Sequence, residues 1–294
     1  VLRDGKAIIR MEKENINEQE IIKNMVGREI DDIFPKRPKY QGGEVVLETV
    51  NFNAFDSTIN RYIVSNSNIK VHRGEVVGIA GLMGAGRTEL AHSIFGNPKK
   101  YKITGKTLVN NKSVVIKSPK DAIDLGIAYV SEDRKKDGLI LQETISQNIT
   151  ISDLFKISKF GILNYFKQNR FAEKYVKDID IRTPSILQEV KNLSGGNQQK
   201  VSVSKWLAAE TKILVIDEPT VGVDVRTKAS FHELITQLAD EGLSIILISS
   251  DLAEMVAVAD RILVMRRYEL VGDLDNSKDY QSMSRSIMNS IQTS

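Results

Sequence analysis

Four short apolar runs along the chain do not alternate with polar positions. They occupy residues 76–80, 213–216, 244–249 and 261–265. A strand with one face in water alternates, whereas a strand buried on both faces is almost continuously apolar. The runs therefore predict a parallel sheet with helices on each side, which is an α/β fold.

Residues from about 139 to 209 follow another pattern, with helix-like spacing of apolar positions and many Lys, Asn and Gln residues. Because no comparable apolar run lies among them, we predict a helical insertion into the α/β layer. The alternative is that one continuous α/β layer extends through this part of the chain.

The first residues also carry local signals. Residues 1–9, VLRDGKAII, predict a short hairpin with its turn at Asp4 and Gly5, and residues 261–271, RILVMRRYELV, look like the same closing hairpin. Such a repeat predicts two similar domains in tandem, with residues 1–10 as the tail of the preceding one.

A helix and a linker are predicted to follow. Asn17 and Glu20 have the spacing of a capping box. An apolar stripe comes next, formed by Ile21, Ile22, Met25 and Val26. Regular structure is then interrupted by Pro35, Pro38, Gly42 and Gly43. We therefore predict a helix and linker over residues 11–43 and a globular domain over 44–294.

Composition narrows the class of protein only moderately. The 294 residues are 41% hydrophobic and 27% charged, as in ordinary globular proteins. A net charge of +3 does not indicate the strongly basic surface that is typical of nucleic-acid-binding proteins. The absence of cysteine excludes disulfides and thiolate metal sites, and it fits a reducing compartment. No apolar run approaches the ~18 residues that span a bilayer.

A glycine-rich segment at residues 81–88, GLMGAGRT, follows the first apolar run and opens a predicted helix. This context is typical of a phosphate-binding loop, in which backbone N–H groups and the helix N-terminus hold phosphates. Thr88 can place its hydroxyl on Mg²⁺. Arg87 departs from the pattern, because a compact lysine is usual there and arginine is a wide planar fork. The alternative is an ordinary strand-to-helix turn.

The apolar run 213–216 delivers Asp217 and Glu218 to the end of a strand. One carboxylate suits Mg²⁺, and the next can polarise an attacking water in phosphoryl transfer. Without the other motifs, the pair would be interpreted as two acidic residues exposed to solvent in a turn.

Residues 193–199, LSGGNQQ, precede a helix predicted from about 198 to 209. Ser194 and the N–H groups of Gly195 and Gly196 can form a second anion cradle, although a simple helix cap is the alternative. Head-to-tail dimerisation would bring this cradle over the γ-phosphate of a partner domain.

Together these motifs resemble a known family from end to end. The chain is similar to the second ATPase domain in tandem ATP-binding proteins of bacterial monosaccharide importers, the ribose, galactose and xylose group. The resemblance is carried by MVGREI, GIAGLMGAGRTEL, SEDRKKDGL, LSGGNQQKV, DEPTVGVDV and ISSDLAEM. Residues 183–185 and 204–206 look most like the xylose and multiple-monosaccharide branch. The resemblance implies an ABC-type P-loop ATPase domain with a mainly parallel core sheet, an antiparallel β part and a helical insertion.

The resemblance also implies roles for individual residues. Nucleotide binding falls to Gly81, Gly84, Ala85, Gly86, Arg87, Thr88 and Glu89. The metal positions are Thr88, Asp217 and Glu132. The catalytic group comprises Glu218 with the signature residues Ser194, Gly195 and Gly196. Gly222 and Asp224 belong to the D-loop, and Ser250 holds the switch position.

Several of these positions depart from the common pattern. Glu132 stands where glutamine is usual, Ser250 where histidine senses the γ-phosphate, and Val221 where arginine is usual. With Arg87, these differences imply a degenerate nucleotide site and weak hydrolysis by this chain alone. Phe55 is the candidate for stacking on adenine.

The implied function is ATP-driven import of a monosaccharide, with ATP and Mg²⁺ as cofactors. The implied partners are the preceding ATPase domain, membrane permease subunits and, through the permease, a periplasmic or surface sugar-binding protein, with no nucleic acid. The implied place is the cytoplasmic face of the inner membrane, as a peripheral protein. The alternatives are a nucleoside or signalling-furanone importer, and a non-hydrolysing regulatory half. The residues do not determine which sugar is carried.

Overall fold

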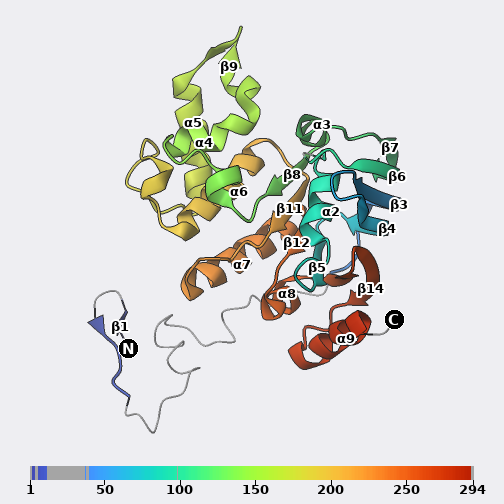
Figure 1. The fold of residues 1–294 in the computed structure, drawn as a ribbon. Helices are drawn as coiled ribbons and strands as arrows, with labels where there is room; N and C mark the ends of the chain where they lie inside the picture. The colour runs from blue at the N-terminus through green and yellow to red at the C-terminus, as the bar shows by residue number, and fades with distance from the viewer. Residues whose placement is uncertain (1, 4–5, 12–36, 38–39, 98, 293–294) are drawn as a thin grey trace.

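The computed structural model describes residues 2–3, 6–11, 37, 40–97 and 99–292. One large sheet organises the fold (Figure 1). Its strands are β3 (Val45–Asp56), β4 (Arg61–His72), β5 (Val76–Gly81), β6 (Lys102–Val109), β7 (Lys112–Val114), β8 (Ile127–Val130), β11 (Ile213–Asp217), β12 (Ser244–Ile248), β13 (Arg261–Arg266) and β14 (Glu269–Asp275). They lie in the order β7-β6-β3-β4-β14-β13-β5-β12-β11-β8.

Half of this sheet is parallel. Strands β13, β5, β12, β11 and β8 run in the same direction, with β5 between β12 and β13. Every residue of β11 and β12 is buried. The prediction from the apolar runs is thus confirmed, because strands covered on both faces have no position that must be polar.

The other half is mainly antiparallel. β3 pairs antiparallel with both β4 and β6, and β6 pairs antiparallel with β7. β14 returns antiparallel beside β13 and joins the two halves by pairing parallel with β4, through Glu269 and Ser65. The antiparallel part implied by the family resemblance is therefore present.

Helices cover the sheet and form a separate cluster. The α-helices are α2 (Arg87–Ile94), α3 (Pro119–Asp124), α4 (Ile145–Thr150), α5 (Tyr165–Asp178), α6 (Gly195–Ala208), α7 (Val225–Asp240), α8 (Leu252–Val258) and α9 (Tyr280–Gln292). Helical turns of other kinds are the π-helical η3 (Arg134–Gly138) and the 3₁₀ segments η4 (Ile151–Ile157) and η5 (Val190–Asn192). Between β8 and β11, helices α4, α5 and α6 pack on one another and form the upper part of Figure 1.

The helical segment also contains a small hairpin, β9 (Ser158–Lys159) and β10 (Ile162–Leu163). Its strands pair antiparallel through Ile162–Lys159 and Leu163–Ser158. The hydrophobic pattern does not predict this hairpin, because a two-residue strand is too short to show a period.

Near the N-terminus, β1 (Leu2–Arg3) pairs antiparallel with β2 (Lys6–Ala7), where the sequence predicts a hairpin. The turn at residues 4–5, the predicted capped helix from Asn17 to Val26, and Pro35 and Pro38 of the predicted linker lie outside the described residues.

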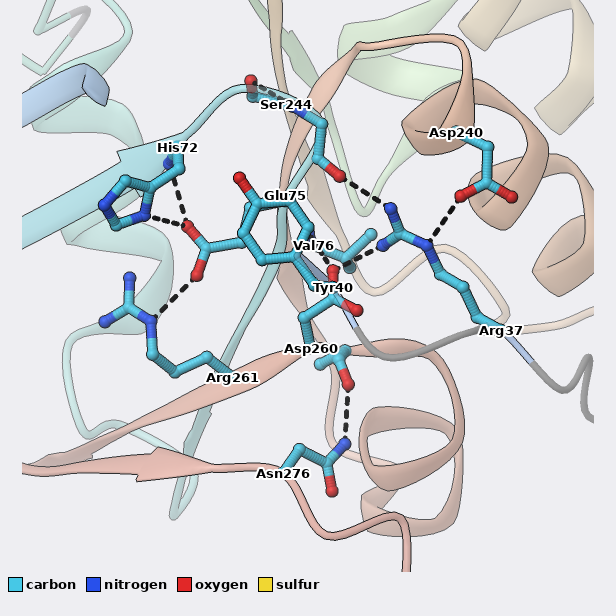
Figure 2. Close-up of polar contacts among 12 residues, drawn as sticks. Arg37, Tyr40, His72, Glu75, Val76, Asp240, Ser244, Asp260, Arg261 and Asn276 are labelled. Atoms are coloured by element: carbon cyan, nitrogen blue, oxygen red, sulfur yellow. Dashed lines mark hydrogen bonds and ion pairs between the residues drawn. The ribbon is translucent and has the colours of Figure 1, made fainter. Parts of the chain in front are cut away.

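Arg37 joins the segment before β3 to the base of the sheet (Figure 2). Its guanidinium forms an ion pair with Asp260 and donates to Asp240 at 2.9 Å and to the Gly74 carbonyl at 2.7 Å. The side chains of Arg37 and Asp260 are only 5% and 4% exposed. Asp260 also accepts the N–H of Val76 at 2.9 Å. The start of β5, the strand that leads into the glycine-rich loop, is therefore tied to this buried pair.

Candidate functional site

The glycine-rich loop between β5 and α2 depends on glycine at its closest turns. Gly84 and Gly86 have φ of +76° and +103°, which L side chains rarely adopt. A Cβ on Gly86 would also lie 2.9 Å from the Ile63 carbonyl oxygen. The loop is held from outside by the Tyr268 N–H, which donates to Ala85 O at 2.9 Å. The backbone is therefore shaped before the helix begins at Arg87.

Arg87 reaches from the loop to the ends of two sheet strands. Its guanidinium donates to the Ser249 carbonyl at 2.8 Å, and Nη2 lies 3.6 Å from Glu218 Oε1. The second oxygen of Glu218 accepts the Ser250 hydroxyl at 2.9 Å. Both side chains of the Arg87–Glu218 pair are nearly buried, at 12% and 11% exposed. Glu218, the expected catalytic residue, therefore contacts both Arg87 and Ser250, two residues that depart from the common pattern. These three residues are called the Arg87–Glu218 contact set.

Asp217 lies beside this pair and is fully buried at the end of β11. Burial raises its pKa to about 6, and the charges of Glu218 and Glu132 add to the rise, while the Thr88 and Tyr129 hydroxyls oppose it. Tyr129 donates its hydroxyl to Asp217 Oδ2 at 2.9 Å.

The environment of Asp217 fits a divalent cation. Its Oδ1 is buried and has no hydrogen-bond partner among the described residues. An unsatisfied carboxylate oxygen close to a threonine hydroxyl is the donor set that Mg²⁺ takes in phosphate sites. The structure therefore brings together Thr88 and Asp217, two of the three expected metal positions. Glu132 is exposed in the following loop, and its charge reaches the same site.

The signature residues begin helix α6. Ser194 is the N-cap, and its hydroxyl accepts the N–H of Asn197 at 3.4 Å and the side-chain amide of Asn197 at 3.1 Å. Asn197 in turn accepts the backbone N–H of Arg182 at 2.9 Å. These bonds fix the cap while the first N–H groups of α6 remain at a helix N-terminus, where anions are stabilised.

The two glycines of the signature lie close to neighbouring side chains. A Cβ on Gly196 would lie 2.1 Å from Thr227 Cγ2 on α7. A Cβ on Gly195 would lie 2.9 Å from Nη2 of Arg134. The close approach of α7 therefore explains Gly196, whereas at Gly195 the neighbouring atom is the end of a flexible arginine that could move aside.

Arg134, which begins η3, is a residue whose role the sequence does not reveal. Its side chain lies against Gly195 and donates to the Val221 carbonyl at 3.3 Å. The residue is only 8% exposed. One guanidinium therefore contacts the signature and the D-loop. The D-loop continues through Gly222, with φ of +71°, to Asp224, which caps α7 by accepting from Thr227 N at 3.0 Å.

A groove of about 220 Å³ opens beside Ser194 and Gly196. Its lining comes from Asp180, Arg182, Ser194, Gly196, Asn197, Lys200, Asp224, Arg226, Thr227 and Ser230. The groove therefore combines a helix N-terminus, which stabilises anions, with three cationic side chains and the carboxylates of Asp180 and Asp224.

A family model described as "ABC transporter" matches residues 64–221, which contain the glycine-rich loop, the signature and both acidic residues. The chain belongs to the ABC transporter family. This ABC ATPase domain thereby inherits ATP binding as a family property.

Curated relatives agree with this assignment. The chain is 48% identical over 274 residues to the xylose import ATP-binding protein XylG of Thermoanaerobacter pseudethanolicus, covering 93% of this chain and 54% of that protein. It is 44% identical to the L-arabinose transport ATP-binding protein AraG of Geobacillus stearothermophilus, covering 98% and 56%. It is 41% identical to the ribose import ATP-binding protein RbsA of Clostridium tetani, covering 96% and 54%. The chain thus spans about half the length of these relatives.

Solved structures show the same fold. CbiO1 of Clostridium perfringens, part of the ABC transporter complex CbiONQ, matches with a TM-score of 0.68 and 21% identity over 83% of this chain and 93% of that one. MJ1267, an ATP-binding cassette in its ADP conformation, matches with a TM-score of 0.69 and 19% identity over 84% and 98%. The ABC ATPase fold, with its mixed and mostly parallel sheet, is therefore confirmed.

Glu89 and Phe55 are two further residues that are expected from the sequence to take part in nucleotide binding. Glu89 lies in the first turn of α2, and its carbonyl accepts the Ser93 hydroxyl at 2.7 Å. Phe55 packs edge-on against Tyr62, with ring centroids 5.2 Å apart. Tyr62 is 52% exposed, so the pair presents aromatic surface to solvent. Among the described residues, no helix is long and apolar enough to cross a bilayer.

A buried polar cluster connects the segments after β11 and β12, and sequence reasoning missed it. Glu254 on α8 accepts from Thr220 at 3.2 Å and from Ser249, and its other oxygen lies 2.6 Å from His232 Nε2. His232 and Glu254 are both fully buried. The cluster holds Thr220 and Ser249 together behind the Arg87–Glu218 contact set. Its members lie far apart in the chain, so no local motif marks them.

Proposed function

We propose that this chain is an ATP-binding domain that powers import of a monosaccharide across a bacterial inner membrane. Its main contribution is the signature loop, which completes a composite ATP site on a partner domain. The observation that carries the proposal is the groove at Ser194 and Gly196, which is lined by α6, α7 and the D-loop. The sugar importers that the chain resembles, at 41–48% identity, support the substrate class.

The partner is the preceding ATPase domain of a tandem chain. Residues 1–10 form its tail, residues 11–43 connect the two domains, and residues 44–294 form the present domain, with a helical subdomain at about 139–209. The relatives, which are nearly twice as long as this chain, leave room for such a domain. The similarity to XylG supports the xylose and multiple-monosaccharide branch.

The domain's own nucleotide site is degenerate. Glu218 would polarise water in an efficient site, but here its carboxylate faces the Arg87 guanidinium and the Ser250 hydroxyl. Both carboxylate oxygens of Glu218 are therefore engaged by other side chains, and neither is free to orient an attacking water. Arg87 must also leave Glu218 and Ser249 before it can contact a phosphate. We therefore assign slow turnover to this site.

The site nevertheless keeps the groups that bind Mg-ATP. Residues 81–89 would cradle the phosphates, and Thr88 and Asp217 would hold Mg²⁺, whose charge would offset that of the phosphates. Asp217 becomes fully ionised when a cation lies beside its buried oxygen. Glu132 lies within electrostatic reach, and Phe55 with Tyr62 provides an aromatic surface for adenine.

The remaining partners follow from this role. Permease subunits dock near residues 132–139 and the helical subdomain, and a periplasmic or surface sugar-binding protein delivers the sugar to the permease. The protein is peripheral, at the cytoplasmic face of the membrane. Residues 132–139 are well placed to transmit this contact, because Arg134 touches both Gly195 and the Val221 carbonyl.

The test compares Ser194→Arg with Glu218→Gln in the tandem protein reconstituted with its permease. Ser194→Arg fills the space needed by the γ-phosphate of the first domain, and it should abolish transport-coupled ATPase activity. Glu218→Gln alters only the slow site and should reduce activity much less. Ser113→Arg, which adds the same side chain on exposed β7, is the control. Equal losses from the two site variants would contradict the asymmetric assignment.

A further inference from the structure

The outer end of the helical subdomain exposes large apolar side chains. They lie on η4, on the β9–β10 hairpin and on the first residues of α5, which contact one another. Their exposed fractions are 90% for Phe155, 93% for Phe160, 75% for Ile162, 68% for Tyr165 and 91% for Phe166. Single exposed apolar residues are common, but five within twelve positions mark a contact surface. These five residues are called the aromatic tip, and Figure 1 shows the hairpin protruding from the top of the subdomain.

Phe160 stands at the turn of this hairpin in a costly conformation. Its φ is +53° and that of Gly161 is +79°, which is the arrangement of a tight hairpin turn with two left-handed residues. Asn or Asp is usual at the first of these positions, and a bulky residue there is an outlier. The Phe160 ring gains little from packing in return, since it is almost fully exposed. Folding stability therefore does not explain this phenylalanine, whereas contact with another body does.

Positive charge surrounds the aromatic tip. Residues 154–172 contain four Lys or Arg and no Asp or Glu. Lys156 is paired with Asp153 and Glu210, at 3.2 and 3.0 Å. The other three cations, Lys159, Lys167 and Arg170, are exposed. Lys159 Nζ lies 5.7 Å from the centre of the Phe160 ring, so charge and aromatic surface are presented together.

This combination selects one kind of partner. Aromatic rings and long cationic side chains fit the interface of a bilayer, where rings enter the headgroup region and cations contact lipid phosphates. The cytoplasmic leaflet carries anionic lipid, which attracts basic segments. Cytoplasmic loops of membrane proteins carry an excess of Lys and Arg, so the permease contact is expected at residues 132–139 and the rest of the subdomain, away from this tip. We infer that the aromatic tip inserts into the headgroup region of an anionic bilayer. The inference rests on the proposed function only in placing the domain beside a membrane.

The first experiment measures binding of this chain to large unilamellar vesicles. Vesicles of phosphatidylcholine with about 30% phosphatidylglycerol mimic an anionic leaflet and should bind the chain. Vesicles of pure phosphatidylcholine should bind it far less. Lys159→Gln with Lys167→Gln should weaken binding about 25-fold, because each cation near an anionic surface is worth a factor of about five. Raising the salt concentration should weaken binding of the unaltered chain in the same direction.

A matched control carries the same changes elsewhere. Lys106→Gln with Lys112→Gln removes two exposed cations from β6 and β7, and Val115→Ser removes an apolar side chain that is 75% exposed. These variants should bind the anionic vesicles like the unaltered chain. If they lose as much binding as the tip variants, attraction is a property of net charge and the inference is wrong. Absence of binding to anionic vesicles would also overturn it.

The second experiment reports insertion directly. Trp206 is the single tryptophan and is only 8% exposed, so a Phe160→Trp variant adds one responsive fluorophore. Its emission should shift to the blue on anionic vesicles and be quenched by lipids brominated near the headgroup. Emission that remains that of exposed tryptophan on bound protein would overturn insertion. So would binding that needs the permease and ignores lipid charge, because the tip would then dock on protein. These outcomes leave the ATPase proposal intact.

Discussion

The guanidinium of Arg87 lies 3.6 Å from the carboxylate of Glu218, which connects the phosphate loop to the residue expected to polarise water. The two residues are 131 positions apart and carry opposite charges in a nearly buried place. Their contact gives the proposed degeneracy of this site a structural basis, because the cation expected to meet phosphate is engaged by the group expected to act as base. Ser250 completes the arrangement from the end of β12.

Replacing Arg87 with lysine should raise nucleotide affinity without creating a fast ATPase. Lysine offers a compact charge beside the β- and γ-phosphates. Ser250 still lacks the imidazole that reaches the γ-phosphate, and Glu132 still places negative charge near it. The measurement is nucleotide affinity and single-turnover hydrolysis in a tandem protein whose first site is disabled. Rapid hydrolysis after this one change would mean that Arg87 is the only defect.

Asp217→Asn should stabilise the nucleotide-free domain above pH 6. The pKa of Asp217 is about 6 in the folded protein, above its ordinary value, so the unfolded chain releases this proton first as pH rises. Stability therefore falls as pH rises from about 4 to about 6, and the loss persists above that range. The variant should match the unaltered domain at pH 4 and exceed it at pH 7 by on the order of 2 kcal/mol.

Chemical denaturation at both pH values measures this difference. Asp275→Asn, an exposed change at the end of β14, is the control and should not alter the pH dependence. The Asp217→Asn variant should also lose the extra stabilisation that Mg²⁺ adds to ATP, compared with ATP and a chelator. A variant that keeps the Mg²⁺ effect would exclude Asp217 from the metal site.

Arg134→Gln should reduce ATP hydrolysis by the tandem protein about tenfold or more. The guanidinium supports Gly195 and bonds the Val221 carbonyl, so its loss lets the signature and the D-loop shift. Nucleotide affinity of the present domain alone should not change, because residues 81–89 do not depend on this contact. Lys135→Gln, on the exposed side of η3, is the control. Loss of affinity in the isolated domain would instead indicate general damage to the fold.

Arg37→Met should destabilise the domain by about 3 kcal/mol, because it leaves Asp260 buried without its cation. Arg73→Met removes an exposed arginine paired with exposed Glu44, and it should cost less than about 1 kcal/mol. Urea denaturation compares the two. Arg37→Met combined with Asp260→Asn should cost less than the sum of the single changes, since the residues contact each other. Additive losses would show that the pair is not coupled.

The sequence determined the α/β layer and the three motifs. The runs 76–80 and 213–216 predict buried parallel strands because apolar continuity is a local property of the chain. The motifs are equally local, since a glycine that permits a turn and a serine that caps a helix act within a few residues. The sequence does not predict the strands β9 and β10, because a segment of two residues shows no hydrophobic period.

Tertiary structure alone decided which side chains meet. Tyr129 donates to Asp217 across 88 positions, Arg134 reaches Val221 across 87, and the His232–Glu254 pair joins two helices. Nothing in the neighbourhood of each residue encodes these contacts, because they arise only when strands and helices pack side by side. The raised pKa of Asp217 has the same origin, because burial is a property of the assembled fold and it disfavours the charged form of this carboxylate.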